Sequence, residues 1–187
     1  MDKNIEWIKS KKVTRTMENL EKHNMEAYYV QDENELIKKI SEFTKEGETV
    51  AVGGSMTLFE TGVIDYLKNG NFNFLDRYKD GISGEELKEV YRKSFFADSY
   101  FASSNAITEN GELYNVDGTG NRVAAMIYGP DKVILVVSTD KIVKDLEAAI
   151  NRNQEYSAPG NAKRLNRKTP CAKVGYCMDC SLSLIHI

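Results

Sequence analysis

The chain has 187 residues, 41% of them hydrophobic, which is enough for one well-filled core. Divided between two full domains, the same length would leave both domains small. Its 28 acidic and 25 basic residues are spread along the chain, so it lacks the basic stripe with which nucleic-acid-binding proteins hold a phosphate backbone. No stretch approaches the roughly 20 apolar residues that cross a bilayer, and the first residues, MDKNIEWIKSKK, lack the apolar core of a signal peptide. We therefore expect a cytoplasmic protein with no nucleic-acid partner and no membrane span.

The first part of the chain predicts helices and short strands in alternation. Apolar residues recur with helical spacing over residues 5–24, and residues 27–30 have the composition of a strand. Asp32 is placed to cap a second helix. The apolar run 50–52 then predicts a buried strand that leads through two glycines into a helix, which we expect Thr57 to cap.

The middle of the chain continues the alternation and adds a hairpin. Residues 72–75 read as a short strand, and Ser83 with Glu86 forms a capping box at the start of a helix. The sequence SYFASS at 99–104 reads as a further strand. Asn110-Gly111, between two short apolar segments, is a strong hairpin signal.

The last regular pattern leads to a fold class. Residues 120–129 predict a short helix, and the continuous apolar run 132–137 is typical of a strand covered on both faces. Thr139 or Asp140 is then expected to cap a helix over residues 141–153. We therefore predict an α/β fold with three layers: a mostly parallel sheet, helices on both of its faces and a small β-hairpin insertion.

The composition changes after Tyr156, where prolines, glycines and basic residues replace the apolar periodicity. We therefore expect one α/β domain over residues 1–157, including the amino-terminal helix. Residues 158–181 form a tail that carries all three cysteines, and we expect it to need a ligand or partner for order.

The glycine turn after the strand 50–52 is the first candidate site. Free backbone N–H groups where a strand ends and a helix begins favour an anion, which predicts a ligand contact at Gly53, Gly54, Ser55 and Thr57. The turn is neither a P-loop nor a dinucleotide-binding fingerprint. The alternative is a tight turn that needs a positive φ at Gly53 or Gly54.

Glu60 is a candidate catalytic residue, as a general acid or base in the same pocket. However, Thr57 and Glu60 also have the spacing of a capping box, in which the carboxylate only satisfies a backbone N–H group. We favour the cap.

A polar segment, SSNAITENGELYNVDGTGNR, supplies many hydrogen-bonding groups around the predicted hairpin. Arg122, near a helix start, can clamp a carboxylate or a phosphate through two hydrogen bonds. The alternative is that these residues are those that turns ordinarily contain. The candidate ligand contacts here are Ser104, Asn105, Asp117, Gly118, Thr119, Gly120 and Arg122.

The tail carries the spacing Cys171-x5-Cys177-x2-Cys180. Thiolates two residues apart can bind one metal ion, so these three residues are candidate ligands of an iron-sulfur cluster, or of zinc as the alternative. Both kinds of centre usually take four protein ligands, and three cysteines leave the set incomplete. Thiols that occur in a tail by chance are the remaining explanation.

Three segments carry a resemblance to a known family: GGSMTLFETGV, SSNAITENGELYNVDGTGNRVAAMIYGP and NAKRLNRKTPCAKVGYCMDC. Through Cys180 the chain resembles the LUD-domain family, in the group of lactate utilisation protein C, as a short form with a cysteine tail. The resemblance implies a fold related to the sugar-phosphate isomerase and CoA-transferase superfamily. It also implies a cytosolic role in the oxidation of L-lactate to pyruvate beside iron-sulfur subunits, and it transfers no active-site residue.

The end of the chain departs from this resemblance. In short relatives with such a tail the cysteine pattern continues to a further cysteine, whereas this sequence ends in LSLIHI. Those six residues are the translation of a common transposon-end sequencing adapter. Our hypothesis is that residues 182–187 are an assembly artefact that replaces a native fourth ligand.

The sequence thus favours a redox-pathway protein that binds a small anionic ligand and works with iron-sulfur partner subunits. Two alternatives remain open. One is a group-transfer or isomerase-like enzyme that acts on a phosphorylated or CoA-linked substrate. The other is a non-catalytic assembly subunit whose metal-bound tail docks on a partner.

Overall fold

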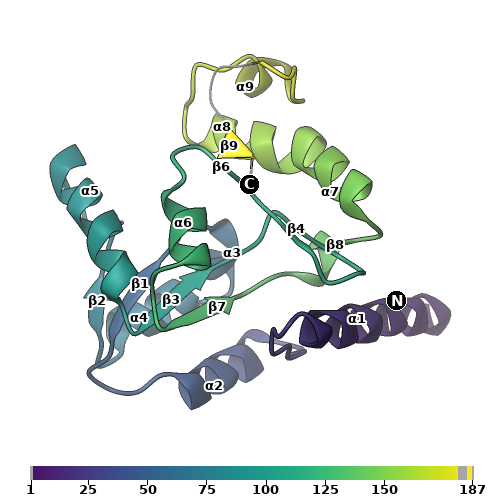
Figure 1. Cartoon of the computed structure of the whole chain (residues 1–187), viewed down its shortest axis with the longest axis horizontal. Helices are drawn as coiled ribbons and strands as arrows, with labels where there is room; N and C mark the ends of the chain where they lie inside the picture. Colours follow the sequence, from purple (N-terminus) through teal and green to yellow (C-terminus); the bar gives the residue numbers. More distant parts are fainter. Residues whose placement is uncertain (1, 181–184, 187) are drawn as a thin grey trace. The chain divides into compact units, whose positions relative to one another are not determined.

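A computed structural model describes residues 2–180 and the backbone of residues 185–186 (Figure 1). The predicted α/β class is confirmed, with a parallel sheet and helices on both of its faces. The described chain divides into two compact units. Residues 30–103 and 120–137 form the sheet unit, and residues 2–29, 104–119 and 138–180 with the backbone of 185–186 form the second unit.

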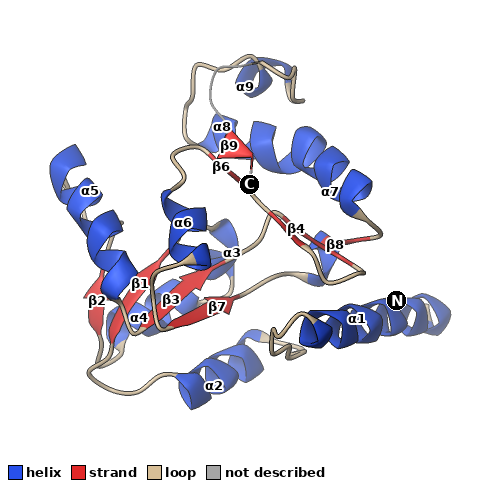
Figure 2. Cartoon of the chain, in the orientation of Figure 1, coloured by secondary structure: helices blue, strands red, loops and turns tan. Residues whose placement is uncertain are grey.

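The sheet unit is built on four parallel strands. They are β1 (Thr49–Val52), β2 (Asn73–Leu75), β3 (Ser99–Ala102) and β7 (Lys132–Leu135), arranged in the order β2-β1-β3-β7 (Figure 2). Val50 pairs with Phe74 on one side and with Ser99 on the other. Because all four strands run the same way, the loops that follow them leave the sheet at one edge.

Helices cover both faces of this sheet. They are α2 (Glu33–Phe43), α3 (Met56–Glu60), α4 (Val63–Asn69), α5 (Gly84–Lys93), the 3-10 turn η1 (Ser94–Phe96) and α6 (Asn121–Ile127). The side chains of Asp32 and Ser83 cap α2 and α5 as expected, and Ser83 forms the complete capping box with Glu86. These local signals were therefore correct.

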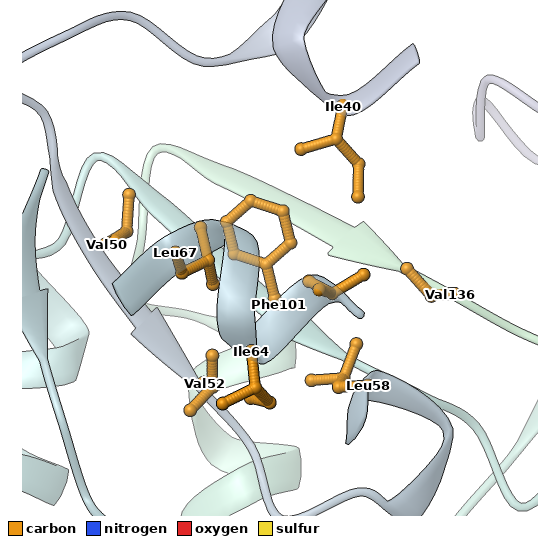
Figure 3. Packing of buried hydrophobic residues seen from close by; sticks show 9 residues of the cluster. Ile40, Val50, Val52, Leu58, Ile64, Leu67, Phe101 and Val136 are labelled. Carbon is orange, nitrogen blue, oxygen red and sulfur yellow. The ribbon is translucent and has the colours of Figure 1, made fainter. Parts of the chain in front are cut away.

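Alternate residues of the central strands fill two cores. On one face Val50, Val52 and Phe101 pack against residues of α2, α3 and α4, and Phe101 lies in the middle of this cluster (Figure 3). On the other face Tyr100 and small residues of β1 and β3 pack against Ala125 of α6. The period of two along each strand therefore gives the three layers.

The second unit combines a long helix, short strands and the helices of the tail. It contains α1 (Lys3–Lys22), β4 (Ala106–Thr108), β5 (Leu113–Tyr114), β6 (Val116–Asp117), η2 (Thr139–Lys141), β8 (Ile142–Val143), α7 (Leu146–Arg152), the π-helical turn η3 (Asn153–Ser157), α8 (Ala158–Arg164), α9 (Cys171–Val174) and β9 (Ile185–His186). Strands β4 and β5 form the expected hairpin, and β8 adds to β4 in parallel. Strand β6 pairs with the backbone of β9. The other residues to which the adapter hypothesis applies, 182–184 and 187, lie outside the described residues.

Helix α1 packs against the hairpin turn through Gly111. A β-carbon at Gly111 would lie 2.7 Å from the backbone of Asn19, and its φ of +87° is one that glycine adopts readily. The side chain of Asn19 donates to the carbonyl of Glu109, and Arg15 pairs with the Glu109 carboxylate at 2.6 Å. Of the predicted Asn-Gly pair, only Gly111 has a positive φ. A two-residue type I′ turn needs a positive φ at both of its central residues, so the hairpin loop here is not that turn.

Three predicted elements were wrong. Residues 27–30 form no strand. Thr57 lies inside α3 and not at its cap, which is Ser55. The helix expected over 141–153 begins only at Leu146, because Asp145 caps it and the residues before it form η2 and β8.

The apolar run 132–137 does form a strand, but at the edge of the sheet. Strand β7 pairs with β3 alone among the described strands of its sheet, and Val133 is 37% exposed. Periodicity cannot distinguish such an edge strand from a central one, because both read as short apolar runs. Among the described residues, no helix is both long and apolar enough to cross a membrane.

A polar network joins the strands at their amino ends. Lys132 donates to the carbonyl of Phe43 and to the carboxylate of Glu48, at 2.8 and 2.9 Å. The hydroxyl of Ser99 donates to the other oxygen of that carboxylate. Burial alone would raise the pKa of Glu48, but the hydrogen bonds from Lys132 and Ser99 outweigh it and hold the pKa below its usual value of 4.5.

The Glu48 network predicts a pH-dependent stability. Because the pKa of Glu48 is lower in the folded chain than in the unfolded chain, its stabilisation is complete above the unfolded value and is lost as the pH falls through the folded value. Glu48→Gln should lower the free energy of unfolding by about 1 kcal/mol near neutral pH, and the difference should shrink below pH 4.5. Urea unfolding across this range measures it. Glu89→Gln, at an exposed pair with Lys93, serves as the control; equal pH dependence in both variants would contradict the prediction.

Candidate functional site

The edge of the sheet at which its parallel strands end carries the candidate site. Strand β1 leads into Gly53 and Gly54, β2 into Asp76 and Arg77, and β3 into Ser103. In open α/β sheets, ligands bind outside the carboxyl ends of the strands. This edge is therefore where the sheet unit can present binding groups from several strands at once.

Gly53 is in close contact with side chains from β3 and α6. A β-carbon at this position would lie 2.9 Å from Cγ of Arg122 and 3.0 Å from the hydroxyl of Tyr100, which are both too close. Gly53 is not among the glycines with a positive φ, and neither is Gly54. The alternative explanation of a turn that needs a positive φ is therefore wrong: Gly53 makes room for Arg122.

Arg122 lies over this glycine and is only 8% exposed. Its guanidinium donates to the carbonyl of Ser103 at 2.9 Å, directly after β3. Its Nη1 also lies 3.8 Å from the sulfur of Met126, one turn further along α6. Arg122 therefore joins α6 to the ends of β1 and β3.

Arg77 is a second arginine at the same turn. A β-carbon at Gly54 would meet its two terminal nitrogens at 3.5 Å. The guanidinium carbon lies 4.8 Å from the ring centre of Tyr91, and Nη2 donates to the hydroxyl of Tyr91 at 2.8 Å. The ring of Tyr78 lies 5.5 Å from the same carbon. Two aromatic rings and a glycine thus surround the Arg77 guanidinium.

Arg77 is a site residue that the sequence did not predict, although a signal for it exists. Arg77 follows the predicted strand 72–75 by two residues, and a charged side chain just beyond a parallel strand lies at the ligand-binding edge. No repeated motif marks it. The position becomes informative only when β2 is known to lie beside β1.

The charge of Arg77 has no carboxylate partner within residues 2–180. Its neighbour Asp76 is 3.1 Å from the amine of Lys68 and accepts the backbone N–H of Tyr78. Because Asp76 is engaged in this way, the site has a net positive character at Arg77.

An aromatic pair lies beside the glycine turn. The rings of Phe59 and Tyr78 meet edge to face at 4.8 Å, and the hydroxyl of Tyr78 lies 3.5 Å from the carbonyl of Gly53. Phe59 is 40% exposed and Met56 is 44% exposed. Apolar surface is therefore available near Arg77.

The remaining predicted residues of this turn have different surroundings. Ser55 is the N-cap of α3 and makes no capping hydrogen bond with its side chain, while Thr57 is buried inside that helix. Glu60 is exposed at the end of α3. Because Thr57 is not the cap, the capping box with Glu60 is wrong, and the catalytic role of Glu60 stays a prediction.

The polar segment contributes mostly structural hydrogen bonds in the second unit. Ser104 donates to the carbonyls of Ala106 and Tyr114, and the Asn105 side chain accepts the backbone N–H of Val116. Arg152 donates to the carbonyl of Asn105 at 2.6 Å, and burial lowers the pKa of its guanidinium. These contacts fix the β4–β6 segment.

The other glycine-rich residues lie around β6 and the start of α6. The carboxylate of Asp117 accepts the backbone N–H of Gly118, and Gly118 and Thr119 are exposed. Gly120 is the N-cap of α6 with a φ of +79°. Within the sheet unit the structure thus brings Gly53, Gly54 and Arg122 together, and their ligand-binding role stays a prediction.

The cysteines lie in and after α9. Cys171 is buried, with its sulfur 3.2 Å from the hydroxyl of Thr169. Cys177 and Cys180 are half-buried, and the backbone N–H of Cys177 donates to the carbonyl of Gln154. Within the described part of the chain, no three His, Cys, Asp or Glu side chains are grouped as metal ligands, and the metal-binding role of the three cysteines stays a prediction.

The contact at Gly53 predicts a loss of stability. Gly53→Ala should displace Arg122 from the carbonyl of Ser103 and lower the free energy of unfolding by about 1–3 kcal/mol, the usual cost of overpacking. Gly84→Ala is the matched control, because nothing lies within 4 Å of its added β-carbon and alanine favours a helix. Chemical unfolding of both variants measures the difference; a Gly53→Ala chain as stable as the Gly84→Ala chain would refute the contact.

Comparison with known proteins now adds to this geometry. A family model described as the LUD domain matches residues 13–182, which include both the sheet-edge site and the cysteine tail. A search of curated proteins found no significant match. A search of solved structures also found none, so the superfamily relationship expected from the resemblance stays a prediction. The expected family is confirmed: the chain belongs to the LUD-domain family, and this membership implies a function related to lactate utilisation.

Proposed function

We propose that the chain acts in lactate utilisation by binding a small carboxylate, lactate or pyruvate, at the carboxyl edge of the sheet. One observation carries the proposal: Arg77 and Arg122, from different elements, both lie against the Gly53-Gly54 turn. Charge-assisted hydrogen bonds from arginine to a carboxylate are about twice as strong as neutral ones, and often pair two N–H donors with two oxygens. A site with positive character at a strand-ending edge suits such a ligand.

The wider role that we propose is that of a subunit or accessory of L-lactate oxidation in the cytoplasm. Conversion of lactate to pyruvate removes two electrons and two protons from the C2 carbon and its hydroxyl group. The electrons would pass to iron-sulfur partner subunits, and a carboxylate such as Glu60 is the candidate base for a proton. The residues at the turn bind and orient the ligand in this scheme.

Ligand binding to the purified chain tests the proposal. Isothermal titration calorimetry and thermal unfolding should show binding and stabilisation by L-lactate or pyruvate, because a ligand that binds only the folded state raises its stability. Acetyl-CoA and a sugar phosphate are the comparison ligands. Binding of these without lactate would favour group transfer or isomerisation, and no binding of any ligand would favour a non-catalytic assembly subunit; both outcomes would overturn the proposal.

We further propose that Cys171, Cys177 and Cys180 supply thiolates to an iron-sulfur cluster, with zinc as the alternative metal. Cys171 lies against Thr169, so the segment after α9 would have to rearrange on metal binding. Iron and acid-labile sulfide should therefore be found in protein purified without oxygen from the source gene. Cys177→Ser should lower both. Zinc without sulfide would indicate that the tail holds a structural metal ion. The absence of any metal would contradict the proposed role of the cysteines as metal ligands.

A further inference from the structure

Arg77 is held in place before any ligand arrives. The β-carbon position of Gly54 is 3.5 Å from both terminal nitrogens and 3.6 Å from the central carbon of the guanidinium. These nearly equal distances put Gly54 over the flat face of the group and not in front of its edge. The ring of Tyr91 lies within 4.8 Å of the same carbon, at cation-π distance. Packing thus restrains the planar group, and its N–H donors point out from its edge.

These donors are not all used by the protein. Nη2 donates to the Tyr91 hydroxyl, and within residues 2–180 the guanidinium makes no ion pair with a carboxylate. A partly buried cation without a counter-charge is unfavourable, since burial removes water that would otherwise solvate it. An anionic ligand at this edge would supply the missing charge and accept the remaining N–H groups.

Arg122 has a different function at the same turn. It is almost fully buried, its stem fills the space over Gly53 and its guanidinium bonds to the carbonyl of Ser103. These contacts make it a positioning residue that fixes the turn. Direct contact with a ligand therefore falls to Arg77.

Apolar surface continues from Arg77 to Phe59. The Tyr78 ring is 5.5 Å from the guanidinium carbon, and the Phe59 ring is 4.8 Å from the ring of Tyr78. Phe59 remains 40% exposed, which leaves part of this apolar surface open to water. A ligand with a carboxylate at one end and an apolar group at the other can use both.

We propose that Arg77 holds the carboxylate of the ligand and that Phe59 and Tyr78 bind its apolar substituent. The preferred ligands are then 2-hydroxy or 2-oxo monocarboxylates whose substituent is larger than the methyl group of lactate. This inference rests on the proposed function, because it concerns the same site; it assigns the ligand contact to Arg77 in place of Arg122 and extends the ligand class beyond lactate and pyruvate.

Calorimetry on the full chain with L-lactate and 3-phenyl-L-lactate tests the carboxylate contact. Arg77→Met should weaken the binding of both ligands at least about tenfold, since it removes the charged hydrogen bonds. Arg92→Met, an exposed arginine on the same sheet unit, should leave both affinities unchanged. If the Arg77→Met chain does not fold, Tyr91→Phe tests the same contact. It removes only the hydroxyl that accepts a hydrogen bond from Nη2, and it should weaken the binding of both ligands several-fold.

The apolar contact needs a separate pair of variants. 3-Phenyl-L-lactate should bind the unmodified chain about tenfold more tightly than L-lactate, because its ring covers exposed apolar surface. Phe59→Ala should remove most of this preference, because it should weaken the binding of 3-phenyl-L-lactate far more than that of L-lactate. Phe96→Ala is the matched control, since Phe96 is 88% exposed on the same unit and lies at η1.

The outcomes separate this inference from the proposed function. Lactate binding that Arg77→Met or Tyr91→Phe leaves unchanged would overturn the assignment of Arg77 and leave the proposed function in place. A chain that prefers lactate over 3-phenyl-L-lactate would overturn the ligand class only. A chain that binds inorganic phosphate more tightly than either carboxylate, or binds neither carboxylate, would overturn both.

Discussion

The missing side chain at Gly53 is the constraint on which the rest of the site depends. Strands β1 and β3 pair in parallel with Val52 opposite Phe101, so the residue after β1 lies beside the end of β3. Arg122 and Tyr100 fill the space that a β-carbon would take there. This contact places the Arg122 guanidinium at the carbonyl of Ser103 and connects α6 to two strand ends. A single atom added at position 53 would therefore disturb three elements.

The two ends of the sheet differ in how their charges are arranged. At the amino ends, Glu48 and Lys132 form an ion pair that is completed by the hydroxyl of Ser99 and the carbonyl of Phe43. At the carboxyl ends, Arg77 lies at the glycine turn without a carboxylate partner among residues 2–180. The Glu48 carboxylate is satisfied by hydrogen bonds within the protein, whereas a positive charge without such a partner attracts an anion. The fold thus places a paired carboxylate at the amino ends of the strands and, within residues 2–180, an arginine without a carboxylate partner, the proposed binding group, at their carboxyl ends.

Local patterns in the sequence predicted most of the sheet unit, and tertiary contacts explain what they missed. Caps at Asp32 and Ser83 and the strand before Gly53 depend only on neighbouring residues, so they could be read directly. The helix expected over 141–153 starts later because Asp145 caps it, and because the residues before Asp145 include β8, which pairs with β4. The position of Arg77 just beyond a strand could be read from the sequence, but its importance could not, because it comes from contact with Gly54 at the end of another strand.

In the site that we propose, two arginines at one turn divide the roles of rigidity and affinity. Arg122 is used within the protein, and its contacts hold Gly53 where the backbone must lie. Arg77 is held by Gly54 and Tyr91, so its side chain has already lost much of its freedom before a ligand binds. An arginine side chain that becomes ordered only on binding costs about 0.5–1.5 kcal/mol of the affinity. Because the packing of the turn meets this cost during folding, more of the interaction between guanidinium and carboxylate would remain available to bind the ligand that we propose.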